Sequence, residues 1–178
     1  IENRVYYRLG IMYETSKGLK RWILKNIEIF TGMLATKVVC ISPSLLQLSN
    51  QIKLSHPSKN IILGKGSCNG IDIVKYDRKN DQELSEKLFK KLDLKDNYVL
   101  GYVGRLVNDK GIIELINAWK IVKKSNQNAK LLLVGPFEDN DKLPSETIEI
   151  INSEPSIIHI GLVENTKVYY QLMNSFIL

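Results

Sequence analysis

Apolar residues recur at helical spacing between residues 19 and 34, with charged residues between them. Steps of three and four residues gather the apolar positions on one face of a helix. The apolar positions are Leu19, Trp22, Ile23, Ile27, Phe30 and Leu34, and the other face carries Lys20, Arg21, Lys25 and Glu28. The pattern predicts an amphipathic helix that packs its apolar face on a sheet. Lying on an anionic membrane is the alternative use of such a basic helix.

A strand, a helix and a second strand are predicted next. The short apolar run 37–41 is followed by Ser42 and Pro43, which suit the cap and the first turn of a helix. Residues 60–63 form the next apolar run. The inward positions expected on the intervening helix are Leu45, Leu48 and Ile52.

Strands and helices alternate regularly in the second half of the chain. The pattern predicts strands over 98–103, 130–134 and 157–160, and helices over 111–124, 145–153 and 167–173. A surface helix with Leu84, Leu88 and Leu92 inward precedes them. This alternation implies a parallel sheet with right-handed crossovers, so the fold class is α/β, a Rossmann-like parallel sheet flanked by helices.

The apolar density falls across a Gly-rich loop and a polar stretch between residues 64 and 80. We therefore predict two parts, residues 1–72 and residues 73–178. The loop contains glycines at 64, 66 and 70, but this spacing is too long for a dinucleotide-binding fingerprint, and no clear helix follows it.

Composition narrows the function further. The net charge is +6, from 25 basic and 19 acidic residues, but the basic residues form no stripe interleaved with aromatics. This distribution argues against nucleic-acid binding. Cys40 and Cys68 lack metal-ligand spacing and are expected to be reduced, buried thiols in a cytoplasmic protein. His56 and His159 are isolated and are expected to be structural, and no run approaches the ~20 apolar residues of a membrane span.

The stretch from Gly101 to Gly111 is the strongest candidate for chemistry, because it joins the end of a predicted strand to the start of a helix. Ligands of open parallel sheets gather at that edge, and a helix amino end favours anions. Gly104 allows close approach to the backbone, Arg105 offers a planar fork for a phosphate, and Lys110 adds a point charge. Two cations beside one helix start suggest a diphosphate.

A structural interpretation of the same residues stays open at this point. Asn108 or Asp109 could cap the helix while Arg105 and Lys110 are solvated charges. Glu138, Asp139 and Asp141 form an acidic loop, which is interpreted as a solvated turn rather than a metal site.

An ordered set of short motifs resembles the group 1 retaining glycosyltransferases of GT-B fold, particularly bacterial enzymes of surface-polysaccharide assembly. In the second half the set comprises Gly104-Arg105-Leu106, Asp109-Lys110-Gly111, Leu131 to Gly135, Ile158 to Gly161, and Tyr169-Tyr170. In the first half it comprises Tyr6-Tyr7, Val38 to Leu45, and Asn69 to Asp72. The resemblance implies the end of an N-terminal acceptor-side domain, the crossover, and a partial C-terminal nucleotide-sugar-binding domain.

The resemblance also implies roles for individual residues. Arg105 and Lys110 would bind the donor diphosphate and stabilise the charge that develops as the sugar departs. Gly104, Gly135 and Pro136 would line the same cleft. The backbone around Leu162 and Val163 would meet the nucleobase. The reaction implied moves a sugar, with retention, from a nucleotide diphosphate donor to a saccharide or lipid-linked acceptor, without cofactor or metal.

The same resemblance implies that the chain is truncated at both ends. Family members carry two glutamates beyond the position matching Leu178, and they contact the donor sugar and the ribose. We therefore expect no useful turnover from these 178 residues alone. The alternative is a non-catalytic nucleotide-binding module. The parent enzyme is expected in the cytoplasm, with attachment to the inner membrane face left open, and the oligomeric state is not fixed by the sequence.

Overall fold

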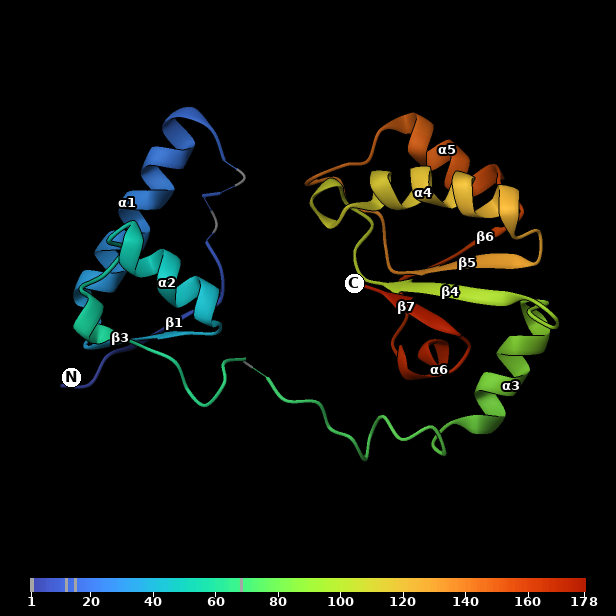
Figure 1. The fold of residues 1–178 in the computed structure, drawn as a ribbon, viewed down its shortest axis with the longest axis horizontal. Helices are drawn as coiled ribbons and strands as arrows, with labels where there is room; N and C mark the ends of the chain where they lie inside the picture. The colour runs from blue at the N-terminus through green and yellow to red at the C-terminus, as the bar shows by residue number, and fades with distance from the viewer. Residues whose placement is uncertain (1, 12, 15, 68) are drawn as a thin grey trace. The chain divides into compact units, whose positions relative to one another are not determined.

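The computed structural model describes residues 2–11, 13–14, 16–67 and 69–178. The chain forms two compact units, Ile1–Ile71 and Asp72–Leu178. Each unit is built on its own parallel sheet (Figure 1). In the described part of the chain, no helix has both the length and the apolar character needed to cross a membrane.

The N-terminal unit is a three-stranded parallel sheet in the order β1-β2-β3. Its strands are β1 (Val5–Arg8), β2 (Lys37–Cys40) and β3 (Asn60–Ile61), joined by α1 (Gly18–Leu34), α2 (Pro43–Gln51) and the short 3-10 helix η1 (Pro57–Lys59). Figure 1 shows α1 and α2 on the same face of this sheet. The predicted strand, helix and strand are confirmed, although β3 is shorter than the predicted 60–63, and β1 was not predicted.

The start of α2 follows the predicted capping chemistry. The Ser42 hydroxyl accepts a hydrogen bond from the Leu45 N–H at 3.1 Å, and Pro43 is the first helical residue. Leu45 then packs against buried Val38 and Cys40 of β2. Cys40 is a free, fully buried thiol, as expected. The prediction for Cys68 lies outside the described residues.

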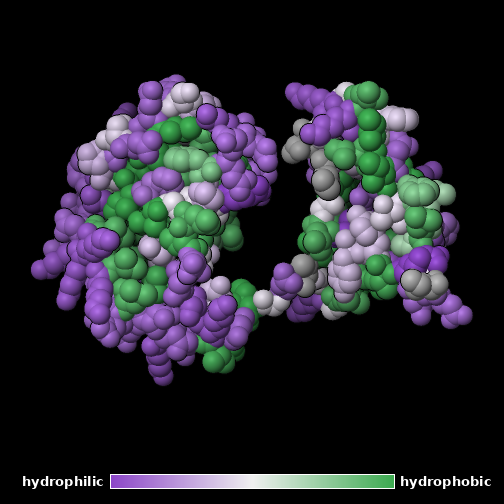
Figure 2. Space-filling view, turned by 180° about the vertical axis from the view of Figure 1, so that it is seen from behind, coloured by the Kyte–Doolittle hydropathy of each residue, from purple (hydrophilic) through white to green (hydrophobic). Residues whose placement is uncertain are grey.

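Helix α1 confirms the predicted element but corrects its orientation. The helix meets the sheet through Glu28 and Gly32, not through the apolar stripe. A Cβ on Gly32 would lie 2.6 Å from the Leu54 carbonyl oxygen, which shows how closely the backbones approach. The stripe itself is exposed, with Trp22 at 65% and Phe30 at 60%. A green strip of hydrophobic surface on this unit is visible in Figure 2.

The C-terminal unit is a four-stranded parallel sheet in the order β6-β5-β4-β7. Its strands are β4 (Tyr98–Val103), β5 (Ala129–Val134), β6 (Ile157–Gly161) and β7 (Ser175–Ile177), and its helices are α3 (Gln82–Lys91), the 3-10 helix η2 (Asn108–Lys110), α4 (Ile112–Ser125), α5 (Ser145–Ser153) and α6 (Lys167–Tyr170). The predicted α/β class is therefore confirmed. The main differences are that α6 ends earlier than predicted, that β7 was not predicted, and that a separate 3-10 turn precedes α4; the bounds of β5, β6 and α4 differ by one residue.

Helices cover both faces of the second sheet, α4 and α5 on one face and α3 and α6 on the other (Figure 1). A hydrophobic core lies on each face of the sheet, and alternate residues of β5 pack into one or the other. Leu131 and Leu133 pack on the face covered by α4 and α5, and Leu132 and Val134 pack on the opposite face. The inner strand β5 is therefore buried on both faces, as is usual for strands of parallel sheets. One expected inward residue, Leu84 of α3, is instead 45% exposed.

Candidate functional site

Three glycines stand side by side where β4, β5 and β6 end. Gly135, directly after β5, has φ +146°, and a Cβ there would lie 1.9 Å from the Gly104 carbonyl oxygen. Gly135 also forms a bridge with Gly161 at the end of β6. The structure therefore brings the predicted Gly104 and Gly135 into contact at the carboxyl edge of the sheet, where parallel α/β sheets bind ligands.

The segment that carries Arg105 is held by its backbone on both sides. The Gly104 N–H donates to the Val134 carbonyl at 2.9 Å, and the Leu106 N–H donates to the Pro136 carbonyl at 2.8 Å. The Tyr102 hydroxyl donates to the Arg105 carbonyl at 3.1 Å. A tyrosine hydroxyl is protonated at neutral pH and can donate, and burial raises the pKa of the Tyr102 phenol further. The backbone of Arg105 is thus fixed before any ligand binds.

The Arg105 side chain leaves this fixed backbone and is 51% exposed. Its Nη1 donates to the Glu138 carboxylate at 2.9 Å. This hydrogen bond is the main cause of the raised pKa of Arg105. The acidic loop, interpreted as a solvated turn, is exposed at Asp139 and Asp141, but its Glu138 is bound to the strongest candidate residue of the site.

A second acidic residue of the same loop holds the turn that carries Lys110. The Asp141 carboxylate accepts from the Asp109 N–H at 2.6 Å, and the Asp141 carbonyl accepts from the Asn108 N–H at 3.1 Å. Neither Asn108 nor Asp109 caps η2 or α4 through its side chain. Lys110 is 47% exposed, with its Nζ 3.8 Å from the Asp109 carboxylate. The helix-capping alternative for Asn108 and Asp109 therefore has no support in the observed hydrogen bonds.

The predicted residues after β6 face different surroundings. Leu162 is 81% exposed, whereas Val163 packs onto the core on the α3 and α6 side. His159 of β6 has a structural partner, because its Nε2 lies 2.9 Å from the Gly135 carbonyl oxygen and its ring packs on Phe137 with centroids 4.5 Å apart. The expectation that His159 is structural is confirmed.

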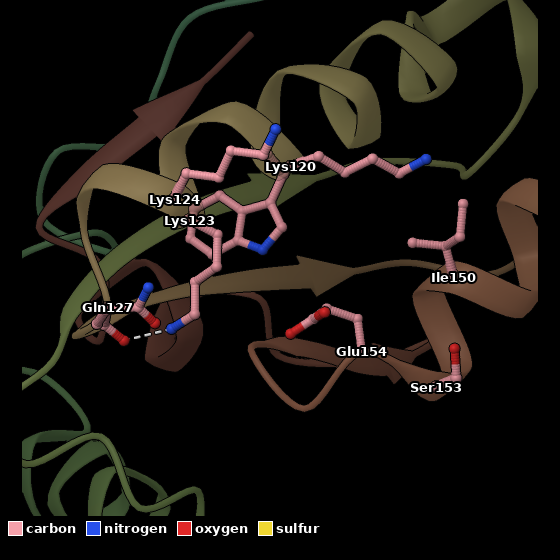
Figure 3. A pocket seen from close by; sticks show the side chains of 8 residues that line it. Lys120, Lys123, Lys124, Gln127, Ile150, Ser153 and Glu154 are labelled. Carbon is pink, nitrogen blue, oxygen red and sulfur yellow. Dashed lines mark hydrogen bonds between the residues drawn. The ribbon is translucent and has the colours of Figure 1, made fainter.

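A cavity of about 410 Å³ lies elsewhere, between the carboxyl-terminal halves of α4 and α5 (Figure 3). Three lysines line it, but Lys123 already donates to the carbonyls of Gln127 and Ala129, and the Glu154 carboxylate offsets part of their charge. Because helices run antiparallel to the strands of such a sheet, this cavity lies at the amino edge, away from the glycine-lined edge. It does not contribute to the candidate site.

Fold and site together define a Rossmann-like α/β protein with a basic site at the carboxyl edge of its second sheet. Residues 84–178 match the family described as glycosyl transferases group 1, and this match covers more than half of the chain. The chain belongs to this family, as its motifs predicted.

Curated relatives support the same assignment. The chain is 36% identical, over 98% of its length, to the capsular polysaccharide biosynthesis glycosyltransferase CapM of Staphylococcus aureus, and covers 45% of that protein. It is 30% identical over 61% of its length to an uncharacterized glycosyltransferase of Methanocaldococcus jannaschii, covering 26% of it. The chain thus spans less than half the length of these relatives.

Solved structures support the fold. A glycosyltransferase from Rickettsia africae matches 85% of the chain with a TM-score of 0.67 and 19% identity, over 40% of its own length. WaaG, a glycosyltransferase of lipopolysaccharide biosynthesis, matches 97% of the chain with a TM-score of 0.74 and 16% identity, over 49% of its own length. The chain therefore has the fold of part of a GT-B glycosyltransferase, as predicted.

Proposed function

We propose that this chain is the part of a retaining glycosyltransferase that binds the diphosphate of a nucleotide-sugar donor. The parent enzyme would transfer the sugar to a hydroxyl of a saccharide or lipid-linked acceptor in polysaccharide biosynthesis. The observation that carries the proposal is Arg105, a half-exposed guanidinium on a rigid backbone two residues after β4. The chain is similar in sequence to an enzyme named for capsular polysaccharide biosynthesis. It is similar in structure to an enzyme named for lipopolysaccharide biosynthesis.

In this proposal the chemistry is electrostatic. Negative charge develops on the diphosphate as the bond to the sugar breaks, and preorganised cations lower the barrier to that step. Arg105 binds one phosphate through its planar fork, and Lys110 supplies a second positive charge from η2. Gly104 and Gly135 have no side chain at this edge, Pro136 lines the same cleft, and the backbone at Leu162 and Val163 meets the base. The proposed charge stabilisation comes from the two side chains, so it needs neither cofactor nor metal ion.

Replacing Arg105 with alanine is expected to weaken nucleoside diphosphate binding by ~1–3 kcal/mol, the usual effect of losing a charged hydrogen bond. The measurement is calorimetric titration of the chain with UDP and GDP at low salt, beside the matching monophosphates. Lys110→Ala should weaken the same binding. Arg78→Ala, which removes an exposed arginine outside the candidate site, serves as the control and should bind like the wild type.

Unchanged affinity in Arg105→Ala would remove this residue from the site. Equal affinity for mono- and diphosphates would argue against a diphosphate site and for a simpler nucleotide-binding module. Each variant is first compared with the wild type by circular dichroism, so that lost binding is not confused with lost folding.

We also propose that α1 attaches the parent enzyme to the inner face of a membrane. The specific observation is the exposed apolar stripe, which includes Trp22, Ile27 and Phe30, on a helix that also carries Lys20 and Lys25. Such a helix can lie in the interface of an anionic bilayer, with aromatic rings among the headgroups. A lipid-linked acceptor would be reached at the same surface.

The chain is expected to float with anionic phospholipid vesicles at low salt, and the double variant Trp22→Ser/Phe30→Ser should float several-fold less. Ile121→Ser, which removes an equally exposed apolar side chain from α4, should float like the wild type. If the wild type stays at the bottom of the gradient, the membrane proposal is wrong.

A further inference from the structure

The loop after β5 turns its acidic side chains onto the candidate site. Glu138 binds the guanidinium of Arg105, and Asp141 binds the backbone of the turn that carries Lys110. Thirty-three residues separate Arg105 from Glu138 in sequence, so the contact is a product of the fold. The negative charges stand where the proposed function requires a negatively charged ligand.

Glu138 is not needed to hold this loop in place. On one side the loop is anchored by the Pro136 carbonyl, which accepts from Leu106, and by the Phe137 ring on His159. On the other side Asp141 is bonded to η2. Among the described residues, the only hydrogen-bonding partner recorded for the Glu138 carboxylate is Arg105. Within the described part of the chain, Glu138 therefore hydrogen-bonds to the functional side chain alone.

Another anion can replace Glu138 as the partner of Arg105. The Arg105 side chain is 51% exposed and that of Glu138 is 34% exposed, so water reaches both partners. Exposed ion pairs contribute only about 0–1 kcal/mol. A diphosphate offers the same kind of oxygen acceptors as a carboxylate, can also bind a guanidinium through two of them, and carries more negative charge. It can therefore displace Glu138, while a carboxylate that stays nearby repels it.

We infer that Glu138 is an internal competitor for the donor diphosphate, which occupies Arg105 in the unliganded chain and must release it when the donor binds. The inference rests on the proposed diphosphate site. Its consequence is that Glu138 lowers the affinity for the donor and for the released nucleoside diphosphate. It also neutralises part of the Arg105 charge when the site is empty.

The test is the titration of Glu138→Gln with inorganic pyrophosphate and with UDP at low salt. Glutamine keeps the size and a neutral acceptor but loses the charge, so both probes should bind about twofold to fivefold more tightly than to the wild type. Glu149→Gln removes the same charge from an exposed position on α5 and controls for net charge. Glu138→Ala, which also removes the hydrogen bond, should tighten binding as well.

The outcomes separate the inference from the proposed function. If the wild type binds, Arg105→Ala does not, and both Glu138 variants bind no more tightly, the diphosphate site stands and the competitor is overturned. Weaker binding in both Glu138 variants means that Glu138 positions Arg105, which also overturns it. If no variant binds either probe, the proposed function fails and the inference with it. Tighter binding in Glu149→Gln as well would assign the effect to net charge.

Discussion

Replacing Gly135 with alanine is expected to destabilise the C-terminal unit by about 4 kcal/mol, near the upper end of single substitutions. Two causes add. The φ of +146° is a conformation that L side chains rarely adopt, and the new Cβ would lie 1.9 Å from the Gly104 carbonyl oxygen. The obstacle is backbone, so it can move only if the junction between β4 and Arg105 moves. Diphosphate binding should therefore be lost together with stability.

Gly161→Ala is the matched control for the Gly135 variant. Gly161 also has a positive φ, of +80°, but a Cβ there meets nothing within 4 Å. Its substitution should cost only about 1 kcal/mol of conformational strain. Tryptophan fluorescence during urea unfolding, in a Trp22→Phe background, would follow the C-terminal unit through Trp119. This residue lies on α4 and is buried in the core. Equal losses in the two variants would mean that the clash is relieved easily.

The parts of the fold that could be predicted are those with unbroken apolar patterns. β4, β5 and β6 alternate with helices of ordinary length, and their sheet is buried on both faces. The hydrophobic period and the order of the elements are therefore enough to predict them. β7 has only three residues and shows little pattern. β1 was missed because Arg8 occupies a position that an apolar residue would normally fill, and it is completely buried there. A buried charge interrupts the apolar pattern from which a strand is predicted.

The same buried charge explains the error in the orientation of α1. Glu28 belonged to the predicted solvent face, yet its carboxylate binds Arg8 at 2.6 Å. Once a carboxylate points at the sheet, the apolar stripe beside it must point elsewhere. Hydrophobic periodicity assumes that charges face water, and it fails where two charges are buried as a pair.

The candidate site was predictable to the extent that it depends on local sequence. Arg105 and Gly104 follow a strand end, which marks the ligand edge without any knowledge of the tertiary structure. The pairing with Glu138 could not be derived, because it joins the ends of two different strands. One signal was present: Glu138 follows β5 as Arg105 follows β4, and adjacent parallel strands end at the same edge. Opposite charges after neighbouring strands are therefore candidates for a pair.

Replacing Glu28 with alanine is expected to destabilise the N-terminal unit by about 3–5 kcal/mol, because the Arg8 charge would stay buried without its counter-charge. Arg8 has no exposed surface, and its Nη2 has no hydrogen-bond partner among the described residues. Its remaining recorded hydrogen bond would be the one from Nη1 to the Ser55 hydroxyl at 3.2 Å. Hydrogen exchange of the β1 and β2 amides would locate the loss in this unit, with the exposed Glu2→Ala as the control.

A double replacement shows whether the stability lost in Glu28→Ala comes from the unpaired Arg8 charge or from the loss of the side chain at position 28. Changing Arg8 to methionine and Glu28 to leucine removes both charges together, and such replacements of buried pairs are often neutral or stabilising. The double variant should therefore recover most of the stability lost in Glu28→Ala. Tyr6 gives an independent readout, because burial and its hydrogen bonds to Glu28 raise its pKa to about 12, and losing Glu28 should lower it. An unchanged Tyr6 pKa would mean that Glu28 does not face the sheet.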